Sequence, residues 1–352
     1  MPQTSPTPAE MNKAATLLYA GHLVAFPTET VYGLGANALD PIAVAKIYAV
    51  KRRPPTSPLI VHVASIDMAK SLVATWPEAA ARLTKKFWPG PLTLVLPIKT
   101  DGETDGAPVE PKLHLFNYPR DPNRRWWSKP PRIPLIVTAG LPTVALRMPD
   151  HPVALALLRE VGIPLAAPSA NRFTELSPTT AEHVRRSLGN DVAFILDGGP
   201  CEVGIESTVL SLAEPQPLLL RPGIIPRALL EHFIGPIVTT DEVPTDAHPA
   251  PGMHPRHYSP RTPLFLVSNG ELPTAGRGIY LQHTRPPNRA GVEVVQMPLP
   301  ARDYAARLYV ALHEADDAQV DWIAVDLPPN VPPEAAEWEA VHDRLRRAAF
   351  RK

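Results

Sequence analysis

Two short polar segments contain hydroxyls and cations at a spacing suited to binding an anion. In PTETVYGLGANA, Thr28 and Thr30 supply hydroxyl groups, and Gly33 and Gly35 would let a ligand approach the backbone closely. The third glycine of a dinucleotide-binding loop is missing, and no phosphate-loop lysine follows. A purely structural turn therefore remains an equal interpretation of this segment.

The second segment, KRRPPTSPLIVHV, places Lys51, Arg52 and Arg53 at the end of a predicted helix. Cations at this position also stabilise a helix through its dipole, so simple capping is the alternative interpretation. His62 alternates with two valines and should lie on the opposite face of a strand from them. A lone strand histidine is more often structural than catalytic.

One arginine is expected inside an apolar strand, in TVALRM. Thr143 and Arg147 are separated by an even number of residues, so both should lie on the same face of that strand. Burying Arg147 is costly unless it meets an anion or a carboxylate. We therefore expect Arg147 to be a functional residue.

Further hydroxyls and one more cation are expected near strand ends and one helix start. Ser177 precedes a helix that Thr179 should cap together with Glu182, and free N–H groups at this end could bind a phosphate. A role for Ser177 in capping alone is the alternative. Ser207 begins a predicted strand and Arg221 ends another, where open α/β sheets bind ligands.

The elements that must position these residues follow an alternating helical and extended pattern, which predicts an α/β fold. A short turn between STVLSL and PLLLRP predicts an antiparallel pair within a mixed sheet. The predicted organisation is a catalytic domain at 9–236, a linker at 237–260 and a small α/β domain at 261–352. Residues 101–136 show no sustained period and are predicted to form a surface insertion.

The composition limits the possible classes of protein. Thirty-five Lys plus Arg balance thirty-five Asp plus Glu, so any anion site must be local. A single cysteine, Cys201, fits a reducing compartment, and neither a signal peptide nor an apolar run of ~18 residues is present. We expect a cytoplasmic protein without membrane contact. Motifs of hydrolases and metalloenzymes are missing, so we expect no metal site built by protein side chains alone.

The motif series resembles the YrdC/Sua5 family. PTETVYGLGANA, KRRP, SPLIVHV, FWPGPLTLVL, TVALRMPDHP, AAPSAN, SPT, GIEST and LLRPG occur in the order typical of that family, and APGMHPRHYSP resembles the linker of its two-domain Sua5 branch. The resemblance implies a YrdC-like twisted mixed sheet with flanking helices and a basic cleft. It also implies a smaller, Rossmann-like α/β C-terminal domain.

The resemblance further implies an adenylyl-transferring enzyme. Its substrates would be L-threonine, bicarbonate and ATP, its products threonylcarbamoyl-AMP and diphosphate. The product would pass to the tRNA threonylcarbamoyl transferase complex, and direct contact with tRNA is possible. Such chemistry needs positioning and charge stabilisation rather than a protein nucleophile, with Mg²⁺ bound mainly through the phosphates. The alternative is a module of the same fold that binds double-stranded RNA or tRNA without adenylation activity.

The family motifs also imply roles for individual residues of this chain. The expected L-threonine residues are Thr30, His62, Arg147, Ala167 and Ser207. The expected ATP residues are Lys51, Arg53, Ser57, Thr143, Ser169, Ser177, Arg221 and Tyr258. Lys51, Arg53 and Arg147 are the candidates for charge stabilisation during the reaction.

Overall fold

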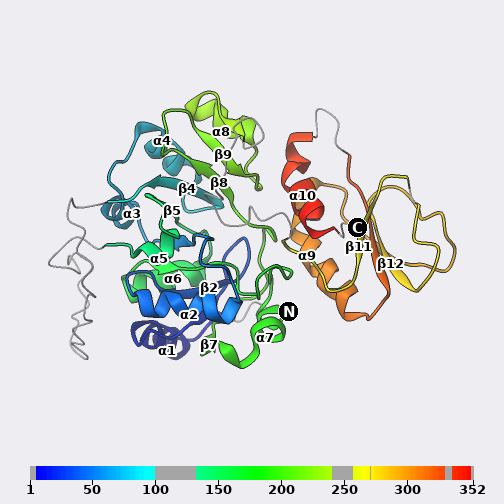
Figure 1. Cartoon of the computed structure of the whole chain (residues 1–352), viewed down its shortest axis with the longest axis horizontal. Helices are drawn as coiled ribbons and strands as arrows, with labels where there is room; N and C mark the ends of the chain where they lie inside the picture. The colour runs from blue at the N-terminus through cyan, green and yellow to red at the C-terminus, as the bar shows by residue number, and fades with distance from the viewer. Residues whose placement is uncertain (1–4, 100–131, 240–256, 270, 330–334, 350–352) are drawn as a thin grey trace.

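The computed structural model describes residues 5–99, 132–239, 257–269, 271–329 and 335–349. Two α/β parts lie side by side, and each has its own sheet (Figure 1). Most of the predicted insertion and most of the predicted linker lie outside the described residues.

The first part is built on a mixed ten-stranded sheet, as predicted. Its strands are β1 Val24–Phe26, β2 Gly33–Asn37, β3 Ile60–His62, β4 Leu92–Pro97, β5 Thr143–Arg147, β6 Leu165–Ala166, β7 Phe194–Ile195, β8 Thr208–Ser211, β9 Leu218–Arg221 and β10 Val238–Thr239. Their spatial order is β10-β9-β8-β4-β5-β3-β6-β2-β1-β7. β8 and β9 pair antiparallel, which confirms the prediction from their short connection.

Helices flank this sheet, and their ends follow local signals in the sequence. They are α1 Pro8–Tyr19, α2 Pro41–Lys51, α3 Ile66–Leu72, α4 Glu78–Phe87, α5 Leu135–Thr138, α6 Pro152–Val161, α7 Ala181–Leu188 and α8 Arg227–Ile234. Asp40 caps α2 by accepting a hydrogen bond from the Ile42 N–H. Arg52 ends the same helix in the left-handed conformation.

Three local expectations differ from the structure. The GLGAN part of the first polar segment is not a turn but strand β2, antiparallel to β1. Gly35 allows this pairing, because a Cβ there would lie 2.7 Å from the Phe26 ring. Thr180, one residue later than predicted, caps α7 by accepting from the His183 N–H. The first sheet also continues to Thr239 in β10, beyond the boundary predicted at residue 236.

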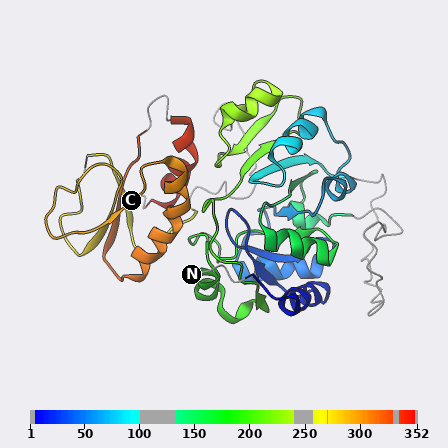
Figure 2. The same ribbon diagram turned by 180° about the vertical axis from the view of Figure 1, so that it is seen from behind.

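The second part is a parallel sheet with two helices on one side. Its strands are β11 Leu264–Val267, β12 Gly278–Gln282, β13 Glu293–Gln296 and β14 Trp322–Asp326, in the spatial order β11-β14-β12-β13. Every pair is parallel, which fits the Rossmann-like expectation. The helices α9 Ala301–Asp317 and α10 Ala335–Ala348 lie between this sheet and the first part, as the two opposite views agree (Figures 1 and 2).

The two parts share a hydrophobic cluster. Val31 and Ile205 of the first part pack in one group with Tyr304 and Leu308 of α9. Gly204 lies at the contact with φ +75°, and a Cβ there would lie 2.6 Å from the Ala306 Cα. Glycine is therefore needed both for the backbone conformation and for the close approach of α9.

Candidate active site

A polar pocket lies beside this domain contact and collects the predicted segments. Its volume is about 50 Å³. Its walls come from β2, β3, β5 and β9 and from the loops around them. The lining residues are Thr28, Thr30, Val31, Gly33, Arg53, Ile60, His62, Arg147, Ala167, Pro168, Ser169, Glu206, Ser207, Arg221, His257 and Tyr258.

Arg147 is anchored at the end of β5 by a carboxylate that the sequence reasoning missed. Its Nη2 lies 2.6 Å from Glu29 Oε1, and both side chains are about 95% buried, with 4% and 5% exposure. The Nη1 donates to Thr30 Oγ1 at 2.8 Å, and Nε donates to the Gly90 carbonyl at 3.3 Å. A buried arginine was expected to meet an anion or a carboxylate, and Glu29 is that carboxylate. The same expectation could have directed attention to Glu29 in the sequence.

His62 lies next to Arg147, because the two residues are paired in register between β3 and β5. Its ring contacts Phe26 edge to face, at 6.1 Å between centroids. Burial, aided by the Arg147 charge, lowers the pKa of His62 to about 3, so the ring is neutral near pH 7. Its buried Nδ1 makes no hydrogen bond within the described part of the chain. A neutral, unpaired ring nitrogen can receive or donate one hydrogen bond to a ligand.

The hydroxyl group of Ser207 and the methyl group of Ala167 complete this side of the pocket. Ser207 Oγ lies 2.8 Å from Thr93 Oγ1 on β4. Ala167 lies directly after β6, and its N–H donates to the Ile60 carbonyl. The structure therefore brings all five predicted threonine residues together in one wall.

Arg53 provides the cation on another wall. Its guanidinium donates to the carbonyls of Ser57 and Pro58 at 3.3 and 3.0 Å and lies 5.7 Å from the Phe173 ring centroid. Burial lowers the pKa of Arg53 to about 10, so it stays charged at neutral pH. Ser57 reaches this wall through its backbone and is not among the lining residues.

Lys51 lies behind the pocket wall. Its Nζ donates to the Ser169 carbonyl at 2.6 Å and also to the Asn171 carbonyl. Burial lowers the pKa of Lys51 well below its ordinary value. Through these two hydrogen bonds Lys51 supports the backbone of the SAN segment, whose Ser169 lines the pocket.

Arg221 lines the pocket near the second domain, whereas Ser177 is not among the lining residues. Arg221 donates through Nε to the Ser207 carbonyl at 3.1 Å and through Nη2 to Ser207 Oγ at 3.2 Å. Ser177 Oγ donates to Glu206 Oε1 at 2.5 Å. Glu206 itself lines the pocket and was not predicted from the sequence, where its GIEST segment drew attention only to Ser207.

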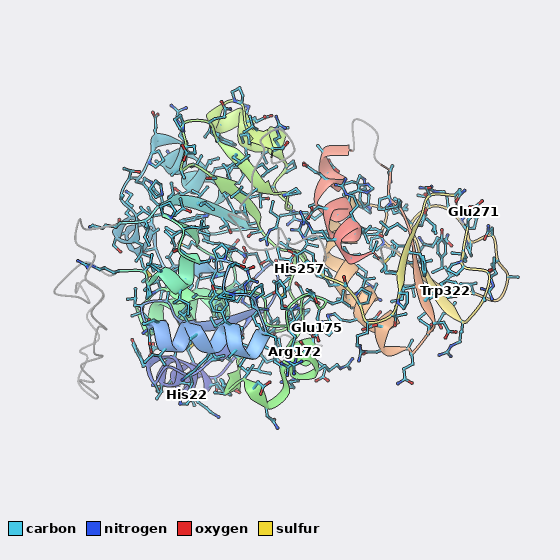
Figure 3. The ribbon with its side chains drawn as sticks, viewed as in Figure 1. His22, Arg172, Glu175, His257, Glu271 and Trp322 are labelled. Atoms are coloured by element: carbon cyan, nitrogen blue, oxygen red, sulfur yellow. The ribbon has the colours of Figure 1, made fainter. Side chains whose placement is uncertain are left out.

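Tyr258 lines the pocket next to His257. Both side chains are buried, and their rings lie 4.1 Å apart. Tyr258 adopts φ +61°, a left-handed conformation that is costly for a bulky residue and is held here by its packing. Figure 3 shows His257 at the junction between the two parts, far from Trp322 on the second sheet.

Thr143, like Lys51, Ser57 and Ser177, is a predicted ATP residue that does not line the pocket. Thr143 begins β5, whereas Arg147 ends it. Residues on one strand face can still lie far apart, because four residues of strand span roughly 13 Å. The strand face of Thr143 could be predicted from the sequence. Its distance from the pocket could not, because it depends on which end of β5 meets the ligand.

In the part of the chain that the structure describes, no group of three or more His, Cys, Asp or Glu side chains is arranged to hold a metal ion. Among the same residues, no helix is both long and apolar enough to cross a membrane.

Comparison with known proteins assigns the chain to a family. The Sua5/YciO/YrdC family model, described as "Telomere recombination", matches residues 16–107 and 124–223. A second model, "Threonylcarbamoyl-AMP synthase, C-terminal domain", matches residues 225–350. The fold and the pocket define a two-domain α/β protein with a basic site at the ends of sheet strands. The chain belongs to the Sua5/YciO/YrdC family.

Individual relatives cover both domains. The threonylcarbamoyl-AMP synthase of Bacillus subtilis (strain 168) is 41% identical over 358 residues, covering 97% of this chain and 93% of the relative. That of Pyrococcus abyssi is 43% identical over 257 residues, or 72% of this chain and 66% of the relative. A crystal structure of P. abyssi Sua5 complexed with L-threonine matches with a TM-score of 0.78 and 35% identity, covering 96% and 94% of the two chains.

Proposed function

We propose that this chain forms threonylcarbamoyl-AMP from L-threonine, bicarbonate and ATP. The observation that carries the proposal is the buried Arg147 guanidinium beside Thr30 and the neutral His62, in one pocket with Arg53 and Arg221. Cations grouped in this way can bind an amino acid carboxylate and a triphosphate next to each other. The relatives that carry the name threonylcarbamoyl-AMP synthase, and the structure of P. abyssi Sua5 complexed with L-threonine, support the same substrates.

Threonine would bind through its carboxylate to Arg147. Its nitrogen would form a bond to the carbon of bicarbonate and lose two protons, one leaving as water with the bicarbonate hydroxyl and the other passing to solvent. The new carboxylate would then attack the α-phosphorus of ATP, and the bond to diphosphate would break. Arg53 and Arg221, which line the same pocket, would stabilise the charge that develops on the phosphates.

Mg²⁺ is proposed to enter with ATP as part of the substrate. Glu206, which lines the pocket, is paired with Arg344. Glu29, which does not line it, is paired with Arg147. Neither carboxylate is therefore an uncommitted metal ligand. This donor set fits an ion held by phosphate oxygens and water. We further propose that the reaction occurs in the cytoplasm and that the product passes to a tRNA threonylcarbamoyl transferase complex.

The proposal is tested by diphosphate release from labelled ATP by the full chain. Release should require both threonine and bicarbonate, and the adenylate should be detected as a labelled product. Diphosphate release that is independent of threonine would contradict the proposal. An Arg159→Gln variant is a suitable control, because that arginine is exposed on α6, away from the pocket.

A further inference from the structure

Glu206 presents an electrostatic problem for the proposed reaction. It lies among the residues that line the pocket, next to Ser207 and close to Arg221, and is 6% exposed. A carboxylate at this place would repel the triphosphate of ATP and weaken the attraction of the pocket arginines. Burial alone would raise the pKa of Glu206, but the charges of Arg344 and Arg221 outweigh burial and lower it. Glu206 is therefore ionised at neutral pH.

The opposing charge comes from the second domain. Arg344, on α10, is 1% exposed, and its Nε lies 2.7 Å from Glu206 Oε2. Its Nη2 donates to the carbonyls of Glu206 and Pro222 at 3.3 and 3.1 Å. Arg344 thus holds both the side chain and the backbone of the GIEST segment.

Other contacts of this network fix the rest of the pocket wall. Glu206 also accepts from Ser177 Oγ at 2.5 Å and from the Tyr309 hydroxyl at 3.2 Å. The Arg344 guanidinium lies 5.3 Å from the ring centroid of Tyr258, which lines the pocket. Asp343 accepts from Arg344 at 2.5 Å, so the guanidinium is itself oriented by a neighbouring carboxylate. One side chain of α10 therefore contacts two lining residues of the pocket, Glu206 and Tyr258, and is linked to Ser177 through Glu206.

We propose that Arg344 is a positioning residue for the ATP site, supplied by the second domain. It neutralises Glu206 and orients it toward Ser177, and it does so without lining the pocket itself. The inference rests on the proposed function and adds a task for the second domain, which is to complete the charge balance of the ATP site.

The first test compares Arg344→Gln with Arg346→Gln in the full chain. Arg346 is exposed on the same helix and donates to the carbonyl of its own-helix residue His342, so it is a matched control. For Arg344→Gln we expect the KM for ATP to rise by about tenfold or more, with the KM for threonine changed by less than about twofold. Direct binding of ATP, measured calorimetrically, should weaken by a similar factor. Equal kinetics of the Arg344→Gln variant and the wild type would overturn the inference.

The second test separates charge neutralisation from mere structural support. In the Arg344→Gln background, Glu206→Gln removes the unpaired carboxylate while keeping an oxygen that can accept from Ser177 and Tyr309. The double variant should recover most of the lost ATP affinity, and Arg344→Lys should retain part of it. A double variant that is as poor as, or worse than, Arg344→Gln would overturn the charge argument.

Two controls keep the outcome interpretable. If Arg344→Gln fails to fold, Tyr309→Phe removes one donor to Glu206 more mildly and should raise the KM for ATP by a smaller factor. A normal KM for ATP in that variant, with no folded Arg344 variant obtained, would count against the network. If the wild type releases no diphosphate in the presence of all three substrates, the proposed function fails, and calorimetric ATP binding then tests the inference separately.

Discussion

Two buried arginine–glutamate pairs flank the same pocket but are built in different ways. Arg147 and Glu29 lie 2.6 Å apart within the first domain, and Arg344 and Glu206 lie 2.7 Å apart across the domain contact. In both pairs each side chain is at most 8% exposed. The arginine lines the pocket in the first pair, whereas the glutamate lines it in the second.

The exchanged positions imply different tasks. Where the arginine faces the pocket, the glutamate behind it orients a cation that can bind the ligand directly. Where the glutamate faces the pocket, the arginine behind it cancels a charge that would repel the ligand. Burying an ion pair contributes little to stability by itself, so we infer that both pairs are kept for what they present to the pocket.

The largest effect should come from breaking the first pair. Arg147→Ala removes the cation proposed to bind the threonine carboxylate and leaves the Glu29 charge buried without its partner. We expect kcat/KM for threonine to fall by at least about 100-fold, and the free energy of unfolding to fall by about 3–5 kcal/mol. Steady-state kinetics and urea unfolding measure the two effects, with Arg159→Gln as control. A variant with unchanged threonine kinetics would show that Arg147 is not the carboxylate site.

A smaller effect should come from loosening the second pair without touching either charge. Gly204→Ala places a methyl group against the backbone of α9, which should displace α9 and α10 together from the GIEST segment. We expect the KM for ATP to rise by roughly threefold to tenfold, with a loss of about 2–4 kcal/mol in unfolding free energy.

Gly291→Ala is the matched control for that change. Gly291 has the same φ of +75°, and a Cβ there would meet no heavy atom within 4 Å. The control therefore carries the backbone cost without the clash. If both alanine variants changed the KM for ATP equally, domain docking would not explain the effect.

The smallest effect concerns pH. The rings of His183 on α7 and His313 on α9 stack at 3.8 Å across the domain contact. Burial, followed by the charge of the other ring, lowers the pKa of His183 to about 3, and burial also lowers the pKa of His313. Both are thus neutral in the folded chain, while the unfolded chain takes up protons below its pKa near 6.5.

The stability that these histidines contribute is therefore present above about pH 6.5 and is lost as the pH falls below it. We expect the unfolding free energy to fall by at most about 1.4 kcal/mol per pH unit and per histidine. Urea unfolding at about pH 7 and about pH 5.5 should show a smaller difference for His313→Gln than for the wild type. His22→Gln, at an exposed position, is the control. If the unfolding free energy of His313→Gln changed between these two pH values as much as that of the wild type, the histidine contact would not explain the pH dependence.

The two pairs also show how far the sequence could predict the site. Arg147 was recognisable because a charged residue inside an apolar strand pattern is unusual. Arg344 is three residues after Val341 and four before Ala348, so helical periodicity places it on the apolar side of α10, but its arginine-rich stretch resembles a solvent-exposed one. Whether Arg344 is buried depends on how α10 packs against the first domain, which local patterns do not encode.

The fold was more predictable than the contacts between its parts. Every strand of the second sheet and the antiparallel β8–β9 pair followed from apolar runs and turn lengths. The strand formed by GLGAN did not, because glycines disfavour strands locally and the pairing with β1 outweighs that preference. Glu29 and Glu206 were missed for a similar reason, since a carboxylate looks solvent-exposed until its buried partner is known.

Through Gly204 and Glu206, the GIEST segment also contacts the second domain. Gly204 leaves room for the α9 backbone and Glu206 binds a guanidinium of α10, so these two of its five residues contact the second domain. A chimaera that grafts a foreign second domain onto this first domain should therefore fail unless the graft supplies both a close-packing helix and a buried cation. By the same logic, a relative that lacks the second domain is released from both constraints, and these two positions should vary there while Ser207 does not.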